Sequence, residues 1–373
     1  MRIFFIEKYI MKLIWEIPEP TGGASVQSLV WMSALNQLGN KVFLGRLSND
    51  NKTIDENYRW INFLPLYDSL KKQPFIWFTY RFPSIFRIIS RNRIDIVYTS
   101  MPTWQTFYIG LICKVLGVKH VIRIASDVNV DGRLKKHHPF PRHVHISLAY
   151  RLADLVIAQN NYQFTSLKGR VKNSNLIKIP NPFIITKKYY HQKKSLSGSI
   201  VWVANFRRVK NMGRLLEICR LMPYEDFKIA GVELPNMDDE TAESISLLKS
   251  LPNVTFFGNI SRSKILDFYA ESKFLLNTSD FEGFSNTFLE AMATGTPILS
   301  TTMVNPDGII NKYQLGIVYE DEISLRDSLD RLSLYEYLEY SKNCLAYVKE
   351  FHDHLALGNK LNQTFEKMMP LNQ

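Results

Sequence analysis

The stretch DFEGFSNTFLEAMATGTPILS, residues 280–300, follows an apolar run and holds two glutamates, Glu282 and Glu290, eight positions apart. A Gly-Phe-Ser-Asn turn separates the first glutamate from a segment with helical apolar spacing. Gly295 ends that segment, and a second apolar run follows it. The order predicts a strand, a loop, a helix and a strand, with both carboxylates near the start of the helix.

The residues alone leave two interpretations of the glutamates open. Thr287 and Glu290 match the S/T-x-x-E capping box, in which Glu290 bonds a backbone N–H at the helix start and Glu282 is an ordinary loop residue. In the other interpretation, the free N–H groups at the helix start bind anionic oxygens, and Gly283 lets a ligand approach the backbone. Two carboxylates beside such a site suit a ligand with hydroxyls and phosphates, such as a sugar nucleotide.

Short apolar runs alternate with helix-like segments along both halves of the chain. This alternation is typical of parallel α/β sheets, and 373 residues are enough for two cores. It predicts two α/β domains with a ligand cleft at the carboxyl ends of the strands. The expected divisions are a first domain at 1–185, a polar linker at 186–198, a second domain at 199–350, and a C-terminal helix at 351–373 that packs back on the first domain.

The individual strands are predicted from apolar runs bounded by turn residues. In the first half they are expected at 12–17, 41–47, 94–100, 119–126, 155–159 and 176–180. In the second half they are expected at 199–206, 227–231, 254–258, 273–278, 296–301 and 316–320. Apolar spacing near 3.6 predicts a helix at 26–39, after the Gly-Gly pair at 22–23.

The segment EGFSNTFLEAMATGTPIL resembles the E-x7-E signature of the retaining glycosyltransferases of family four, which have the GT-B fold of two Rossmann-like α/β domains with parallel sheets facing a central cleft. The resemblance extends to flanking segments of the second half. These are the strand–helix–strand region at 254–279, the basic loop ANFRRVKNMGRLLEIC at 204–219 and the interdomain motif KIPNPF at 178–183. In the first half, the Gly-containing turn and helix at 20–42 are similar to the family's early turn.

The resemblance implies roles for the residues of the signature. The second glutamate of the family holds the ribose hydroxyls of the donor nucleotide, which assigns that role to Glu290. The first contacts the donor sugar near the reacting centre, which assigns a catalytic role to Glu282. The first domain would then bind the acceptor and the second the nucleotide sugar. Backbone N–H groups that hold sugar hydroxyls and phosphate would come from Gly283, Phe284, Ser285 and Asn286.

The basic loop NFRRVKN supplies the cations that a diphosphate needs. The family places one arginine and one lysine here, and Arg207 and Lys210 are assigned to donor binding and to stabilising the leaving diphosphate. Asn205 stands where the commoner G-R-x4-K form has its arginine, so Arg208 is an alternative to Arg207. The other interpretation of this loop is a solvated basic turn.

Two further sites in the first half follow from the resemblance. Gly22 and Gly23 would give close backbone access to the donor diphosphate or the acceptor. The family's functional histidine after the fourth or fifth strand has no counterpart, since that position reads RIASDVNVDGR. Asp127 is the candidate catalytic residue there, as an acceptor of a hydrogen bond from the acceptor hydroxyl or donor sugar, and a helix-capping aspartate is the alternative.

No metal or other cofactor is expected. The segment KKHHPFPRHVH, residues 135–145, holds four of the eight histidines, but their spacing matches no standard zinc pattern. With its two prolines and basic residues, it is interpreted as a loop over the cleft or against the acceptor.

A net charge of +11 favours an anionic partner. Segment 71–93 interleaves aromatic residues with six basic ones, which suits an anionic membrane surface, and a core helix with a solvated edge is the alternative. Three cysteines far apart, and the absence of a long apolar stretch, favour a cytoplasmic protein attached peripherally to the inner membrane.

The function expected from the sequence is transfer of a sugar, with retention, from a nucleotide-diphosphate sugar to a glycan or lipid-linked glycan in bacterial surface polysaccharide synthesis. One alternative is a sugar-nucleotide epimerase of the same fold. The other is a basic nucleic-acid-binding protein, although no recognised nucleic-acid motif is present and no nucleic-acid partner is expected.

Overall fold

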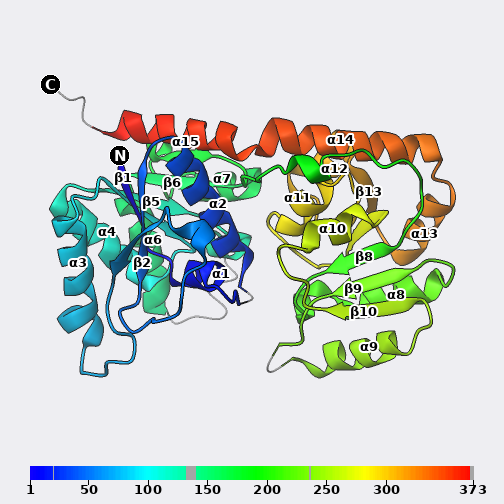
Figure 1. Ribbon diagram of the computed structural model, residues 1–373, viewed down its shortest axis with the longest axis horizontal. Coiled ribbons are helices and arrows are strands. Elements are labelled where there is room, and N and C mark those ends of the chain that lie inside the picture. Colours follow the sequence, from blue (N-terminus) through cyan, green and yellow to red (C-terminus); the bar gives the residue numbers. More distant parts are fainter. Residues whose placement is uncertain (20, 132–139, 235–236, 370–373) are drawn as a thin grey trace. The chain divides into compact units, whose positions relative to one another are not determined.

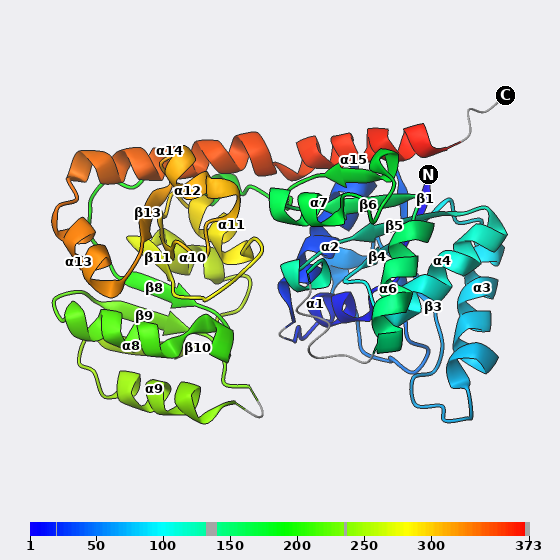
Figure 2. The same cartoon turned by 180° about the vertical axis from the view of Figure 1, so that it is seen from behind.

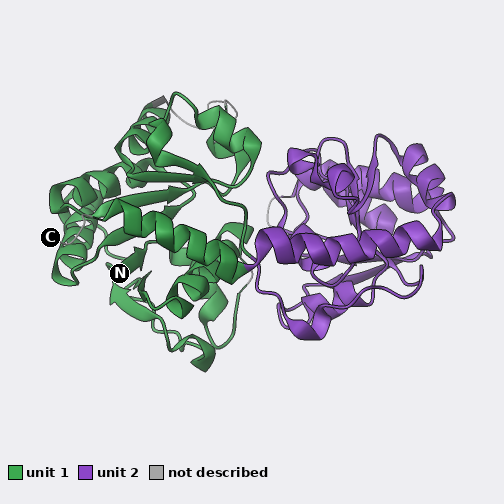
Figure 3. Ribbon diagram, turned by 90° about the horizontal axis from the view of Figure 1, so that it is seen from above, with its two compact units in different colours: residues 1–182, 354–373 green, residues 183–353 purple. Residues whose placement is uncertain are grey.

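The computed structural model describes residues 1–19, 21–131, 140–234 and 237–369. Its contacts divide the chain into two compact units, 1–182 with 354–373 and 183–353 (Figure 3). The domain bounds and the linker expected from the sequence stay predictions.

The first unit is built on a seven-stranded parallel sheet with the strand order β3-β2-β1-β4-β5-β6-β7 (Figure 1). Its strands are β1 (Arg2–Phe5), β2 (Lys41–Arg46), β3 (Asn62–Pro65), β4 (Ile96–Ser100), β5 (Lys119–Arg123), β6 (Leu155–Ala158) and β7 (Leu176–Lys178). Successive side chains point to opposite faces, so Ile3 and Phe5 pack into one core cluster and Phe4 into another. Both faces of this sheet are therefore buried, as its unbroken apolar runs require.

Helices cover both faces of the first sheet (Figure 1). They are α1 (Met11–Ile14), α2 (Gly23–Gln37), η3 (Trp77–Arg81), α3 (Phe82–Arg91), α4 (Trp104–Leu116), α6 (Phe140–Leu152), α7 (Asn161–Leu167) and α15 (His354–Met368). Figure 2 shows α6 beside α4, against which it packs. The last helix, α15, packs on α2, where a Cβ atom at Gly358 would lie 2.7 Å from Cβ of Ala34. Glycine at 358 is thus needed for close helix contact.

The second unit has a six-stranded parallel sheet with the order β10-β9-β8-β11-β12-β13. Its strands are β8 (Ile200–Val203), β9 (Phe227–Ala230), β10 (Val254–Gly258), β11 (Phe274–Asn277), β12 (Ile298–Thr301) and β13 (Gly316–Tyr319). Its helices are α8 (Met212–Leu221), α9 (Asp239–Lys249), α10 (Ile265–Ala270), α11 (Asn286–Met292), α12 (Ile309–Lys312), α13 (Glu322–Asp330) and α14 (Leu334–His352). Two core clusters again occupy the two faces, with Trp202 in one and Val201 in the other.

The strand predictions are confirmed for β2 and for β4 to β13, all of which lie inside the expected segments. The strand expected at 12–17 is wrong, because the chain forms the helical turn α1 there and the strand of this region is Arg2–Phe5. The apolar run at the N-terminus is long enough for both elements, and pairing with β2 and β4 selects the earlier part. The strand β3 was not predicted from the sequence; it is a short edge strand that ends in Pro65, where proline is tolerated.

The segment expected as a linker packs against the second unit. The amide of Lys193 donates a hydrogen bond to Oγ of Ser341 in α14 (2.9 Å), and its Nζ donates to the carbonyl of Tyr269 in α10 (3.1 Å). Burial lowers the pKa of Lys193 to about 8. This part of the chain is therefore held by specific bonds.

Candidate active site

The basic loop and the first glutamate of the signature meet in the second unit. Nζ of Lys210 lies 3.0 Å from Oε1 of Glu282, and the two side chains are only 18% and 23% exposed. Asn277, the last residue of β11, donates from Nδ2 to Oε2 of Glu282 (3.3 Å). Its own Oδ1 accepts a hydrogen bond from the amide of Ser279 (3.0 Å). Both oxygens of the Glu282 carboxylate are thereby oriented.

The backbone of the basic loop is tied to the segment that follows β11. Oγ1 of Thr278 donates to the carbonyl of Lys210 (2.7 Å) and accepts a hydrogen bond from Nε1 of Trp202 (2.9 Å). A second bond joins the same two segments: the amide of Asp280 donates to the carbonyl of Val209 (3.0 Å). These bonds fix the position of the basic loop relative to the segment that holds Glu282.

Asn211 completes this connection. It has left-handed backbone angles (φ 50°, ψ 71°), and its Oδ1 accepts from the amide of Arg214 to cap the N-terminus of α8 (2.9 Å). Its Nδ2 donates to Oδ1 of Asp280 (2.8 Å). No role was predicted from the sequence for Asn211, Asn277, Thr278 or Asp280. The available signal was the run of polar residues directly after a buried strand, at the edge where ligands of α/β sheets bind.

The second glutamate, Glu290, lies inside α11 and does not cap it. The N-cap of this helix is Ser285, which makes Glu290 the fifth helical residue, and the N-cap side chain receives no capping bond. The capping-box interpretation is therefore wrong. Burial raises the pKa of Glu290 to about 7, while the Arg262 charge and the Tyr269 hydroxyl act in the opposite direction. A carboxylate kept poorly solvated inside a helix is not explained by helix stability.

The Gly-Phe-Ser-Asn turn is supported from the end of α14. The Phe284 ring packs against the His352 ring with centroids 5.1 Å apart, and His352 is fully buried. The carbonyl of His352 accepts a hydrogen bond from the amide of Phe183 (2.7 Å). Both ends of the second unit's chain, at 183 and 353, therefore join beside the residue that supports this turn.

The two candidate arginines of the basic loop differ in their surroundings. Arg207 is exposed and makes no ion pair within the described parts of the chain. Arg208 lies 3.6 Å from Glu240 in a surface ion pair whose side chains are 78% and 73% exposed. The free cation of this loop is thus Arg207.

The remaining candidates, Gly22, Gly23 and Asp127, lie in the first unit. Gly22 is the N-cap of α2, and a Cβ atom placed on it would meet nothing within 4 Å. The fold itself therefore does not require glycine at this position.

Asp127 follows β5 and is the first residue of a 3-10 turn, not its N-cap. Its Oδ1 accepts hydrogen bonds from Nε2 of Gln163 (2.8 Å) and Nδ2 of Asn160 (3.2 Å). Among the described residues, none donates to its Oδ2. The helix-cap alternative for Asp127 is therefore wrong. Two hydrogen bonds orient its carboxylate through Oδ1, and Oδ2 can still accept a hydrogen bond from a ligand.

A buried polar cluster near the carboxyl ends of β1, β4 and β5 was not anticipated. The Glu7 carboxylate accepts hydrogen bonds from the hydroxyls of Ser25 (2.5 Å), Ser28 (2.7 Å) and Ser100. Arg123 ends β5, the strand next to β4, and is 1% exposed. Its guanidinium donates a hydrogen bond to Oδ1 of Asn181 and lies 5.4 Å from the centroid of the Trp31 ring. Burial lowers the pKa of Arg123. The carboxyl edge of this sheet thus carries both charges.

The histidine-rich segment at 135–145 falls partly outside the described residues, since the structure describes it only from residue 140 on. Within α6, His145 bonds the Tyr108 hydroxyl (3.1 Å). Among residues 1–19, 21–131, 140–234 and 237–369, no cluster of three metal-ligating side chains is present. No helix in the same ranges is long and apolar enough to cross a bilayer.

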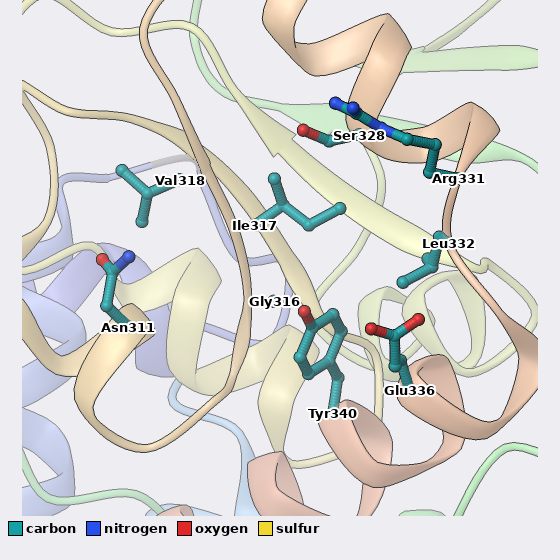
Figure 4. A pocket seen from close by; sticks show the side chains of 9 residues that line it. All are labelled: Asn311, Gly316, Ile317, Val318, Ser328, Arg331, Leu332, Glu336 and Tyr340. Atoms are coloured by element: carbon teal, nitrogen blue, oxygen red, sulfur yellow. The ribbon is translucent and has the colours of Figure 1, made fainter.

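A hollow of about 320 Å³ lies beside the edge strand β13 (Figure 4). Its walls come from β13, α12, α13 and α14, and include Arg331, Glu336 and Tyr340. Glu336 is committed to the capping box at the start of α14, where its Oε2 accepts from the amide of Ser333 (3.0 Å). The hollow contains none of the candidate site residues.

The second unit matches a known family. Residues 188–350 fit the model of the glycosyl transferases group 1, a range that contains the basic loop, Glu282 and Glu290. Residues 188–350 belong to the group 1 glycosyltransferases. This confirms the family resemblance seen in the sequence and the prediction of a glycosyltransferase. Among curated proteins, no relative matches the sequence.

Solved structures show that this glycosyltransferase has the GT-B fold. Sucrose-phosphate synthase from Thermosynechococcus elongatus is 17% identical, with a TM-score of 0.78 and 98% of each chain covered. HepE from Anabaena, solved in complex with UDP, is 16% identical, with a TM-score of 0.75 over 98% of this chain and all of that one. WaaG, a glycosyltransferase involved in lipopolysaccharide biosynthesis, is 15% identical, with a TM-score of 0.67 over 98% of this chain and 99% of that one. The fold prediction is confirmed at the level of two parallel α/β sheets.

Proposed function

We propose that the second unit binds a nucleoside-diphosphate sugar between the basic loop and the 282–286 turn, and that the enzyme transfers the sugar to a hydroxyl of a glycan or lipid-linked glycan. The observation that carries this proposal is the ion pair between Lys210 and Glu282 (3.0 Å), which brings a cation for the diphosphate beside a carboxylate for the sugar. The complexes of HepE with UDP and with UDP-glucose support a uridine nucleotide as the first donor to test.

Each donor group has a matching element. Glu290 accepts hydrogen bonds from the ribose hydroxyls, and Glu282 accepts them from the sugar near the reacting carbon. Main-chain N–H groups of Gly283, Phe284, Ser285 and Asn286 face the remaining sugar hydroxyls and the phosphate. A hydrogen bond to a charged group contributes roughly 1.5–3 kcal/mol, so each carboxylate is worth about ten- to a hundredfold in binding or rate.

The chemistry needs charge stabilisation more than a nucleophile. As the bond between the anomeric carbon and the diphosphate breaks, negative charge builds on the leaving oxygen, and Arg207 and Lys210 stabilise it without a metal ion. The incoming hydroxyl oxygen forms the new bond on the same face, and its proton passes to the departing phosphate oxygen. Positioning and electrostatics then supply most of the rate gain.

Two features of the first unit support acceptor and donor contacts there. At Gly22 the fold leaves room for a side chain, so glycine serves a ligand's approach to the backbone, and Gly23 shares this role. Asp127 has one carboxylate oxygen already held by two amides, and its other oxygen is suited to accept a hydrogen bond from the acceptor hydroxyl.

The acceptor is expected at a membrane surface. Segment 71–93 carries six basic residues among exposed aromatic side chains, which suits anionic lipid on the cytoplasmic face of the inner membrane. The enzyme would attach there peripherally. It would act in bacterial surface polysaccharide synthesis (capsule, O-antigen or exopolysaccharide), in which sugars are transferred to lipid-linked chains.

Calorimetry over uridine- and guanosine-diphosphate sugars tests donor binding, and proton NMR of the product tests retention at the anomeric carbon. We expect one donor to bind, Glu290→Ala to weaken its binding ten- to a hundredfold, and Glu282→Ala mainly to slow turnover. Normal kinetics in both variants would refute the site assignment. If the protein epimerised a nucleotide sugar without an acceptor, the epimerase alternative would replace the proposed function. If it bound oligonucleotides tightly and no donor, the nucleic-acid-binding alternative would replace it.

A further inference from the structure

An apolar groove of about 470 Å³ runs between α3 and α4 in the first unit. One wall consists of Phe78, Phe82 and Phe86, and the other of Tyr108, Leu111 and Ile112. Because the phenylalanines repeat every four residues along one helical path, the groove follows that path for about 12 Å. Apart from Arg87, all of its lining residues are apolar or aromatic.

Several of the wall residues are exposed although they are large and apolar. Phe78 is 51% exposed, Phe86 37% and Leu111 38%, and Val115 lies one turn beyond Leu111 at 76%. A contiguous apolar surface of this kind on a soluble unit marks a binding surface more often than chance exposure. The core-helix alternative explains Ile85 and Ile89, which are 1% exposed, and leaves the groove unexplained.

The charges around the groove have one sign. Arg87 lines it, and Lys71, Lys72 and Arg91 are exposed on the same segment. Neither residues 69–94 nor the α4 sequence at 104–116 contains an aspartate or glutamate. A partner for this surface therefore combines negative charge with hydrocarbon, as an anionic bilayer lipid does.

We propose that the groove takes up one hydrocarbon chain of an anionic bilayer phospholipid while Arg87 meets its phosphate. The inference deepens, and rests on, the membrane contact of the proposed function. A phospholipid meets both features of the groove at once, because its hydrocarbon chain would contact the apolar walls and its phosphate would pair with Arg87. Lipid uptake would anchor the first unit at the membrane.

Two tryptophans can report whether a chain enters. The Trp77 ring lies 5.1 Å from the Phe82 ring, and the Trp104 ring lies 5.8 Å from the Tyr108 ring. Vesicles of phosphatidylcholine and phosphatidylglycerol, with bromine atoms on the acyl chains of the phosphatidylglycerol, should quench their fluorescence. Pelleting with the same vesicles without bromine measures membrane binding separately.

The deciding comparison uses two variants of one helix with the same charge change. Leu111→Glu places a carboxylate in the groove wall, and Val115→Glu places one a turn away, outside the groove. We expect Val115→Glu to weaken vesicle binding by about fivefold or less and to keep the quenching. Leu111→Glu should abolish the quenching and weaken binding more than tenfold. If Leu111→Glu lowers the melting temperature, Leu111→Gln and Val115→Gln repeat the comparison without charge.

The other outcomes overturn the proposal in distinguishable ways. Equal behaviour of the two variants would show membrane binding without a lipid in the groove. A wild-type protein that does not pellet with the vesicles would refute both the groove and the membrane contact, and would leave donor binding and transfer untouched. A change of oligomeric state in Leu111→Glu, measured by light scattering, would make the groove an interface between copies of this chain.

Discussion

Nζ of Lys210 lies 3.0 Å from Oε1 of Glu282, and the two residues come from different loops at the same edge of the second sheet. Both side chains are more than three-quarters buried, so water screens their charges poorly. Without a donor, each charge is balanced by the other. A bound diphosphate would offer Lys210 a second partner and leave Glu282 available to the sugar.

The first prediction concerns this pair. Lys210→Met and Glu282→Gln should each destabilise the fold, because each leaves a poorly solvated charge or dipole without its partner. The double variant should regain part of the loss, with a coupling of about 2 kcal/mol in urea unfolding. Turnover should fall ten- to a hundredfold in all three variants.

The control for this prediction is an exposed pair of the same unit. Lys249 and Glu233 lie 3.1 Å apart, and both side chains are 53% exposed. Their double-variant cycle should give a coupling of no more than about 0.5 kcal/mol and leave turnover unchanged. Equal couplings in the two cycles would contradict the importance of burial for the Lys210–Glu282 pair.

The second prediction concerns the hydroxyl that positions the basic loop. Thr278→Val removes the donor to the Lys210 carbonyl and the acceptor of the Trp202 N–H, so it should cost about 1–3 kcal/mol of stability. The displaced lysine should also lower kcat/KM about tenfold. Thr278→Ser keeps the hydroxyl and should restore both.

Thr294→Val is the matched control for Thr278. Thr294 is also buried, and its hydroxyl donates to the carbonyl of Ala291 (2.8 Å) at the end of α11. We expect this variant to lose stability and to keep its kcat/KM at temperatures where it is folded. A parallel loss of activity in both variants would mean that Thr278 acts only through stability.

Much of the fold was predictable because parallel strands buried on both faces leave continuous apolar runs in the sequence. The exceptions have local causes. The N-terminal run supports either a strand or a helix, and only pairing with β2 and β4 decides that Arg2–Phe5 is the strand. The edge strand β3 buries little, and its Pro65 opposed a strand assignment.

The candidate-site residues that belong to a sequence motif were predictable. Those that reach the site only through tertiary contacts were not. Glu282, Glu290 and Lys210 stand in patterns, whereas Thr278 acts through a bond to a residue 68 positions away. The capping-box alternative for Glu290 failed because the helix begins at Asn286, two residues too early for that motif. Boundaries of this precision depend on packing.

The third prediction separates acceptor chemistry from donor binding. Asp127→Asn keeps Oδ1, which accepts from Asn160 and Gln163, and replaces the second carboxylate oxygen by an NH2 group. Transfer to acceptor should fall ten- to a hundredfold, while calorimetry should show unchanged donor affinity.

Asp55→Asn serves as the control for Asp127, because Asp55 caps a short turn of the same unit and accepts from the amide of Asn57 (2.8 Å). It should alter neither transfer nor donor affinity. Wild-type transfer rates in Asp127→Asn would refute the role proposed for its free oxygen.

The last prediction uses the pKa of Glu290, which burial raises from 4.5 to about 7. In the folded protein the ionised form is disfavoured, so this group lowers stability as the pH rises from about 4.5 to 7, by up to about 3 kcal/mol. Glu290→Gln removes the ionisation. The variant should therefore match the wild type in urea unfolding near pH 4.5 and be more stable above pH 7, although it binds the donor more weakly.

Glu336→Gln should show the opposite dependence on pH. The Ser333 hydroxyl and amide hold the pKa of Glu336 below its usual range, so its contribution to stability is present at neutral pH and is lost as the pH falls through that lowered value. Its variant should lose stability at pH 7 and approach the wild type in acid. If Glu290→Gln were less stable than the wild type at pH 8, the carboxylate of Glu290 would be stabilising the fold, and its raised pKa would no longer argue for a ligand.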